Sequence, residues 1–100
     1  MAGKKLNWSE RAKQELKEIV RFYRQRNGNN NYGRKLLQEF REAKKRVEKE
    51  EFAGQRFEDT DLRFVIVLRT YQMFYRIGWK RNTVVAVWDG RRNPDDLKFD

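Results

Sequence analysis

The chain has 100 residues, of which 38% are hydrophobic and 39% are charged, with a net charge of +9 and neither histidine nor cysteine. This length suits a single domain spanning residues 1–100, and the missing residue types exclude disulfides, thiolate metal sites and imidazole catalysis, so we expect no metal and no cofactor. The charge predicts an anionic partner, and because no apolar run is long enough to cross a membrane and no signal peptide is evident, we expect a cytoplasmic protein.

The first half of the chain predicts a short edge strand followed by two helices. Residues 5–9 are a strand candidate that ends at Ser9, a typical helix N-cap. Apolar residues then recur at helical spacing in two stripes, which predict helices over about 9–26 and 31–51, with Gly54 as the C-cap of the second. The turn-forming stretch RNGNNN separates them, so we expect a helical hairpin.

The second half predicts three strands, over residues 62–69, 71–79 and 83–89, because β-branched and aromatic residues dominate there. The gaps between them are too short for crossovers and favour antiparallel pairing. Alternation places Tyr71, Met73 and Tyr75 on one apolar face, which the helical hairpin would cover. The result is an α+β fold in the order β-α-α-β-β-β. We expect Phe74, Trp79 and Trp88 to lie in the core rather than on a stacking surface.

The stretch VWDGRRNP, residues 87–94, ends the last predicted strand with two adjacent arginines. Such a doublet is usually a solvated turn, since runs of like charge face water. Asp89 is the carboxylate nearest to the doublet, and an Asp-Gly pair is typical of turn capping. From these residues alone, Arg91 and Arg92 are either solvated turn residues or the ligands of an anion.

Three stretches, WSERAKQELKEIVRFY, LRTYQMFYRI and VVAVWDGRRNP, occur in an order that resembles the RelE/ParE superfamily of type II toxin–antitoxin toxins. The resemblance implies a twisted antiparallel sheet packed on one side by the two N-terminal helices. It also implies a growth-inhibiting toxin that a cognate antitoxin holds inactive. The basic charge leads us to expect an acidic antitoxin, bound partly as an amphipathic helix or strand.

The resemblance also implies site residues, because arginines at strand ends of RNA-cleaving members grip the substrate. Arg69, Arg92 and, less closely, Arg91 match those arginines and are the catalytic candidates. A guanidinium suits this role because it stabilises the charge that develops on a cleaved phosphate. Further candidates for contacts with nucleic acid are the basic and aromatic residues Arg63, Arg76, Lys80, Arg81 and Phe99.

The sequence does not decide between the targets of two branches of the superfamily. The arginine-rich sheet favours ribosome-dependent cleavage of mRNA, and the alternative is ParE-like inhibition of DNA gyrase. A basic nucleic-acid-binding module without catalysis is a further possibility. Proton transfer would fall to a lysine, to Tyr71 or Tyr75, or to Asp89, because the chain has no histidine and its tail carries Phe99 where some relatives have tyrosine.

Overall fold

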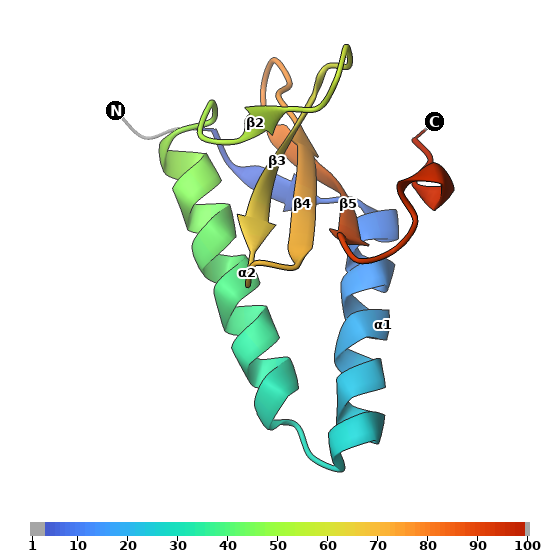
Figure 1. Cartoon of the computed structure of the whole chain (residues 1–100). Helices are drawn as coiled ribbons and strands as arrows, with labels where there is room; N and C mark the ends of the chain where they lie inside the picture. The colour runs from blue at the N-terminus through green and yellow to red at the C-terminus, as the bar shows by residue number, and fades with distance from the viewer. Residues whose placement is uncertain (1–3, 100) are drawn as a thin grey trace.

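The computed structural model describes residues 4–99 and confirms an α+β fold, with two helices packed on a five-stranded sheet (Figure 1). In chain order the elements are β1 (Leu6–Trp8), α1 (Glu10–Asn27), α2 (Asn31–Lys49), β2 (Gln55–Arg56), β3 (Leu62–Val67), β4 (Tyr71–Arg76), β5 (Asn82–Asp89) and the short 3-10 helix η1 (Pro94–Asp96). The strands lie in the order β1-β5-β4-β3-β2. The predicted helical hairpin and hairpin-connected strands are therefore both present.

The sheet is mixed rather than antiparallel throughout. Strands β5, β4, β3 and β2 pair antiparallel, as expected, but β1 pairs parallel with β5, with Leu6 opposite Asn82. Parallel neighbours need a long connection, and the helical hairpin that follows β1 begins such a crossover. The edge position predicted for residues 5–9 is correct, and the parallel direction corrects the antiparallel expectation at this edge.

The first helix begins and ends as its sequence predicts. The Ser9 hydroxyl accepts a hydrogen bond from the Ala12 amide at 3.1 Å, which satisfies one of the free amides at the helix N-terminus. Gly28 closes the helix in the left-handed conformation, with φ of 73°, and its amide donates to the Arg24 carbonyl.

The second helix ends earlier than expected, at Lys49, and Glu50 rather than Gly54 caps it. The segment beyond it is fixed to the sheet by the buried Tyr75. The Tyr75 hydroxyl donates to the Glu51 carbonyl at 2.6 Å and accepts from the Gly54 amide at 2.9 Å. The chain then adds the two-residue strand β2, which is too short and too exposed to leave a periodic signal.

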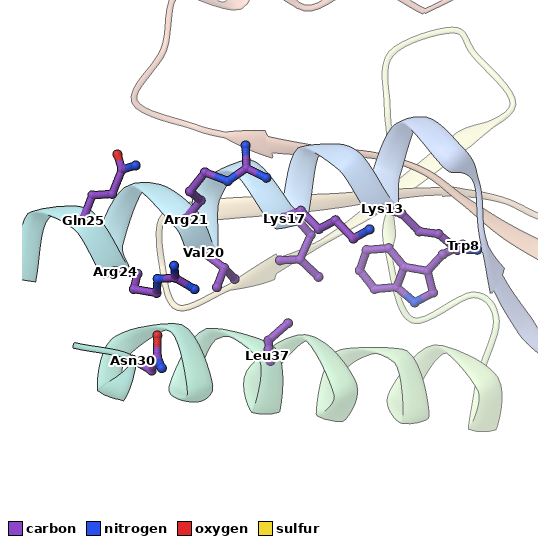
Figure 2. A pocket seen from close by; sticks show the side chains of 10 residues that line it. Trp8, Lys13, Lys17, Val20, Arg21, Arg24, Gln25, Asn30 and Leu37 are labelled. Atoms are coloured by element: carbon purple, nitrogen blue, oxygen red, sulfur yellow. The ribbon is translucent and has the colours of Figure 1, made fainter. Parts of the chain in front are cut away.

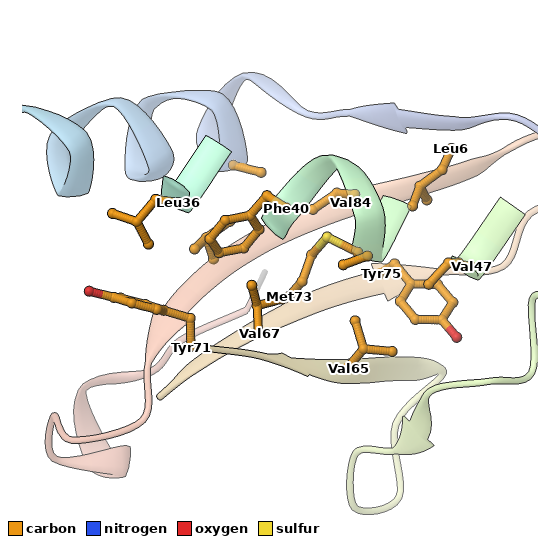
Figure 3. Packing of buried hydrophobic residues seen from close by; sticks show 13 residues of the cluster. Leu6, Leu36, Phe40, Val47, Val65, Val67, Tyr71, Met73, Tyr75 and Val84 are labelled. Carbon is orange, nitrogen blue, oxygen red and sulfur yellow. The ribbon is translucent and has the colours of Figure 1, made fainter. Parts of the chain in front are cut away.

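The main core fills the space between the helices and one face of the sheet (Figure 3). Tyr71, Met73 and Tyr75 alternate along β4 and point toward the helices, as their spacing predicts. Leu36 and Phe40 of α2 pack against them and are 0% and 1% exposed. Burying a side chain of this size contributes about 1.5–3 kcal/mol, so this contact surface holds the helical hairpin on the sheet.

The opposite face of the sheet carries a second, smaller aromatic cluster. Phe74, Ala86 and Trp88 are buried there, although only one covered face was expected. The C-terminal tail returns over them, and the Phe99 ring lies 5.0 Å from the Phe74 ring, centroid to centroid. Arg11 of α1 donates to the Lys98 carbonyl, which ties the tail to the first helix. Both faces of the central strands are therefore covered, so the turns at the two ends of the sheet are the exposed parts to search for a site.

Candidate functional site

The turn between β3 and β4 presents Arg69 in an unfavourable backbone conformation. Leu68 and Arg69 have φ of 51° and 63°, in the left-handed region that non-glycine residues rarely occupy. Val67 pairs with Tyr71, so Leu68, Arg69 and Thr70 form the loop, and glycine or asparagine is the usual residue at a left-handed position. Leu68 packs against the main core, which offsets its strain, whereas the Arg69 side chain is exposed. Nothing in the packing therefore requires an arginine at this position.

The turn after β5 lies beside the β3–β4 turn. Tyr71 pairs with Asp89 at the end of the sheet, and the Gly90 amide donates to the Thr70 carbonyl at 2.8 Å. A Cβ atom at Gly90 would lie 2.8 Å from that same carbonyl oxygen, so only glycine permits the close approach. The two turns lie together at one end of the sheet. This end is here called the arginine rim, and it carries Arg69, Arg91 and Arg92.

The two adjacent arginines have different environments, and Arg91 is held by neighbours within the protein. Its guanidinium donates to both carboxylate oxygens of Asp89, at 3.0 and 2.8 Å, and to the Tyr23 hydroxyl at 3.3 Å. The Arg91 amide also donates to Asp89 at 2.9 Å, which closes the turn. Tyr23 in turn accepts from the Tyr71 hydroxyl, so Arg91 ends a chain of polar contacts beside the helices.

Arg92 lies against the other face of the sheet. Its guanidinium carbon is 4.4 Å from the centroid of the Trp88 ring, a cation–π contact with a residue of the aromatic cluster. Among residues 4–99, no carboxylate forms an ion pair with Arg92. The donors of Arg92 are therefore available to an outside ligand, while the flat ring beneath fixes the direction of the side chain.

Three groups expected to transfer protons, Asp89, Tyr71 and Tyr75, form hydrogen bonds within the fold, and Tyr75 lies away from the rim. The hydrogen bond from Arg91 lowers the pKa of Asp89, so this carboxyl is a weak base near neutral pH. Burial raises the pKa of both Tyr71 and Tyr75, which keeps their hydroxyls protonated. Tyr23 is the exception, because the hydrogen bond from Tyr71, and then that from Arg91, lower its pKa. The rim therefore combines anion-binding groups with Asp89 and Tyr71, which are poorly suited to general acid–base catalysis. Tyr23 has a lowered pKa, but its hydroxyl already accepts hydrogen bonds from Tyr71 and Arg91.

The other expected nucleic-acid contacts are scattered over the molecule rather than gathered at the rim. Arg63 donates to the Gly54 carbonyl at 2.8 Å on the helix side of the sheet. Arg76 forms an ion pair with Asp61 at 2.9 Å. Lys80 and Arg81 lie in the β4–β5 turn, at the opposite end of β4 from the rim.

The aromatic residues singled out from the sequence, Phe74, Trp79, Trp88 and Phe99, differ in their exposure. Phe74 and Trp88 are buried, as expected, and Phe99 packs on Phe74 within the aromatic cluster rather than projecting as a free stacking surface. Trp79 is 87% exposed, which corrects its expected place in the core.

A basic groove on the helical hairpin was not foreseen from the sequence. It has a volume of about 710 Å³, and Figure 2 shows Trp8, Val20 and Leu37 in the space between α1 and α2. Within the described part of the chain no carboxylate lines the groove, and four cations line it along one side of α1: Lys13, Lys17, Arg21 and Arg24. Their spacing of three or four residues was visible in the sequence, but it reads as an ordinary solvated helix face until the apolar floor is known.

Two further properties of the described chain bear on function. No group of three or more Asp or Glu side chains gathers into a metal site within residues 4–99. No helix in the same part of the chain is long and apolar enough to cross a membrane.

Comparisons with known proteins agree on one family. The model of a family described as "ParE toxin of type II toxin-antitoxin system, parDE" matches residues 6–94. Among solved structures, a chain of the "Chromosomal ParDE TA system from P. aeruginosa" is similar, with a TM-score of 0.75 and 20% identity over 86% of this chain and 95% of that chain. At this identity the likeness shows a common fold. No curated protein sequence matches the chain.

Proposed function

Because the chain belongs to the ParE toxin family of type II toxin–antitoxin systems, we propose that it inhibits growth by acting on DNA gyrase in the cytoplasm. One observation carries the choice of target: the arginine rim offers the exposed Arg69 and Arg92, while Asp89, Tyr71 and Tyr75 are engaged in the fold. Binding to a protein or to its DNA needs only the former, whereas cutting RNA also needs groups that move protons.

Ribosome-dependent cleavage of mRNA is the second candidate. It is favoured by Arg92, whose guanidinium rests on Trp88 with no carboxylate partner among residues 4–99. Such a fork binds phosphate oxygens in two places, which suits a scissile phosphate as well as it suits an acidic protein surface. Both proposed functions use the arginine rim. They differ in the target that the rim contacts, which is gyrase in one case and ribosome-bound mRNA in the other.

Two parallel assays on the purified toxin, free of antitoxin, distinguish gyrase inhibition from mRNA cleavage. Gyrase supercoiling should be inhibited, while mRNA on translating ribosomes should stay intact. Arg92→Ala should raise the concentration for half-inhibition about thirtyfold or more, as for other hot-spot arginines, and Arg92→Lys should restore part of the effect. Arg34→Ala, which removes the same charge from an exposed position on α2, is the matched control. Cleaved mRNA together with unaffected supercoiling would reverse the assignment.

We further infer that the cognate antitoxin places an acidic amphipathic helix in the basic groove. The groove offers an apolar floor between two helices and four cations along one side, a surface that suits a helix with one apolar and one acidic face. Complementary charge would speed association and make it sensitive to salt. The groove lies on the helical hairpin and the arginine rim on the sheet, so the antitoxin has a binding surface apart from the toxic residues.

Charge reversal tests the antitoxin surface separately from toxicity. The double variant Lys17→Glu/Arg21→Glu should stay toxic but should no longer be neutralised by the antitoxin encoded in the adjacent reading frame. Its association rate should fall and lose most of its salt dependence. The control Lys35→Glu/Arg46→Glu changes the same charge at exposed positions elsewhere on α2 and should behave as wild type. Full neutralisation of the groove variant would place the antitoxin on another surface.

A further inference from the structure

The turn between β4 and β5, residues 77–81, exposes a tryptophan that no packing explains. Trp79 is 87% exposed, and the other exposed large hydrophobic side chains lie between 48% and 60%. A large aromatic side chain left in water contributes nothing to folding and is enriched where proteins bind partners. The turn lies at the far end of the sheet from the arginine rim (Figure 1), so its role is separate from the site described above.

The exposure of Trp79 does not come from a loose turn, because buried polar contacts hold the turn on both sides. Asn82 is fully buried, accepts from the Gly78 amide at 3.1 Å and donates to Glu51 at 3.0 Å. Lys4 donates to the Gly78 carbonyl at 2.6 Å. A Cβ atom at Gly78 would collide with the Arg81 carbonyl oxygen, so the backbone closes tightly there. The fold therefore presents Trp79 from a rigid support.

Basic side chains of this turn and of the first strand region line a hollow. The hollow has a volume of about 380 Å³ and is lined by Lys5 and Asn7 of the first strand region and by Lys80 and Arg81 of the turn. Among residues 4–99, no carboxylate lines this hollow. Glu51 and Asp61 form ion pairs with Lys4 and Arg76. The Lys80 ammonium lies 5.3 Å from the centroid of the Trp79 ring. The turn thus places the Lys80 charge beside an exposed aromatic ring.

We propose that this surface, the tryptophan turn (Lys5, Asn7, Trp79, Lys80 and Arg81), binds single-stranded nucleic acid. A base would stack on Trp79, and the neighbouring phosphates would contact the cations of the hollow. Stacking on an aromatic side chain beside a basic groove is the general physical basis of single-strand binding. A lipid surface would call for several apolar side chains together, and the hollow at this turn is lined by the polar residues Lys5, Asn7, Lys80 and Arg81. The charge pattern fits a phosphate backbone, which carries one negative charge per nucleotide.

Binding of a fluorescein-labelled oligothymidine of about fifteen nucleotides, a length near the usual site size, tests the proposal by anisotropy and tryptophan quenching. Wild type should bind with quenched tryptophan emission. Trp79→Ala should weaken binding about five- to a hundredfold, and Trp79→Phe should weaken it less. Lys80→Ala/Arg81→Ala should lower the slope of log affinity against log salt by about 1.4, or 0.7 for each lost phosphate contact.

Two matched variants separate the tryptophan turn from general attraction to a basic protein. Phe22→Ala removes another exposed aromatic ring, and Lys17→Ala/Arg21→Ala removes two charges from the basic groove. Both should bind the oligonucleotide nearly as wild type does, and circular dichroism should show that every variant is folded. Equal affinity of Trp79→Ala and wild type would overturn the proposal. So would binding to phosphatidylglycerol vesicles without binding to the oligonucleotide, which would assign the turn to a membrane surface.

Discussion

Replacing Arg69 with glycine should make the protein more stable and less active at once. Arg69 has φ of 63°, a conformation that costs a non-glycine residue about 1–2 kcal/mol and costs glycine nothing. Glycine also lowers the free energy of unfolding by about 0.5–1 kcal/mol, because it gives the unfolded chain more conformational freedom. The net gain in the free energy of unfolding is therefore about 0–1.5 kcal/mol, with a midpoint of about 0.75 kcal/mol. For a chain of this length the midpoint raises Tm by about 3–6 °C.

Activity should move in the opposite direction, because Arg69→Gly removes an exposed guanidinium from the arginine rim. Loss of a hot-spot arginine costs about 2 kcal/mol or more of binding free energy. The toxin concentration for half-inhibition of supercoiling should therefore rise about thirtyfold or more. Differential scanning fluorimetry measures Tm, and the supercoiling assay measures inhibition on the same preparation.

Arg69→Ala is the control that separates the two effects. It removes the same guanidinium but keeps a Cβ atom in the left-handed region, so it should lose activity without a gain in Tm. A glycine variant that is less stable than wild type would show that the backbone strain is absent. A glycine variant that inhibits as strongly as wild type would show that Arg69 is a solvated turn residue.

Two other substitutions probe contacts within the fold. Tyr75→Phe leaves the Gly54 amide without its partner at a buried position, and the free energy of unfolding should fall by about 1–3 kcal/mol in urea titrations; an unchanged midpoint would contradict this. Asp89→Asn should be less stable than wild type at pH 7. Because Arg91 lowers the pKa of Asp89, the stabilisation is complete above the ordinary value of 3.8 and is lost as pH falls through the lower folded value. The two proteins should therefore converge in Tm at low pH, and a constant difference would exclude the ion pair as its source.

Local patterns were enough to predict most of the fold. The apolar stripe that includes Leu36 and Phe40 predicted a helix face, and alternation in 71–75 predicted the side of β4 that meets it. The parallel pairing of β1 with β5 depends on contacts between residues about 75 positions apart, such as Leu6 and Asn82. No local period carries that information, and the same holds for the tail residue Phe99 on the far face.

The candidate site was predictable in its position but not in its detailed contacts. Strand ends predicted that Arg69 and the doublet share one rim, and the Gly90–Thr70 hydrogen bond joins the two turns there. The ion pair of Arg76 with Asp61 joins a strand to a separate turn, and such partners follow only from tertiary structure. The frequency of arginine along the predicted strands therefore overstated how many arginines lie on one surface.

The two arginines at the end of β5 avoid repelling each other because their side chains point to opposite faces of the sheet. Two guanidinium groups about 4 Å apart repel by about 1 kcal/mol even in water, so a doublet kept side by side would weaken the turn. Instead, Arg91 turns toward the helices and pairs with Asp89, and Arg92 turns toward Trp88 on the other face. The bidentate pair cancels the charge of Arg91 locally, and among residues 4–99 Arg92 forms no ion pair.

This division predicts opposite phenotypes for two adjacent alanine substitutions. Arg91→Ala removes the partner of Asp89 and Tyr23, so Tm should fall and inhibition of gyrase should change less than threefold, about 0.7 kcal/mol. Arg92→Ala removes one cation–π contact at the surface, so Tm should stay nearly constant while inhibition falls about thirtyfold or more. Measuring both quantities for both variants tests the roles directly. Equal loss of inhibition in the two variants, with unchanged Tm, would mean that the doublet acts as one clamp and that the ion pair with Asp89 opens when the target binds.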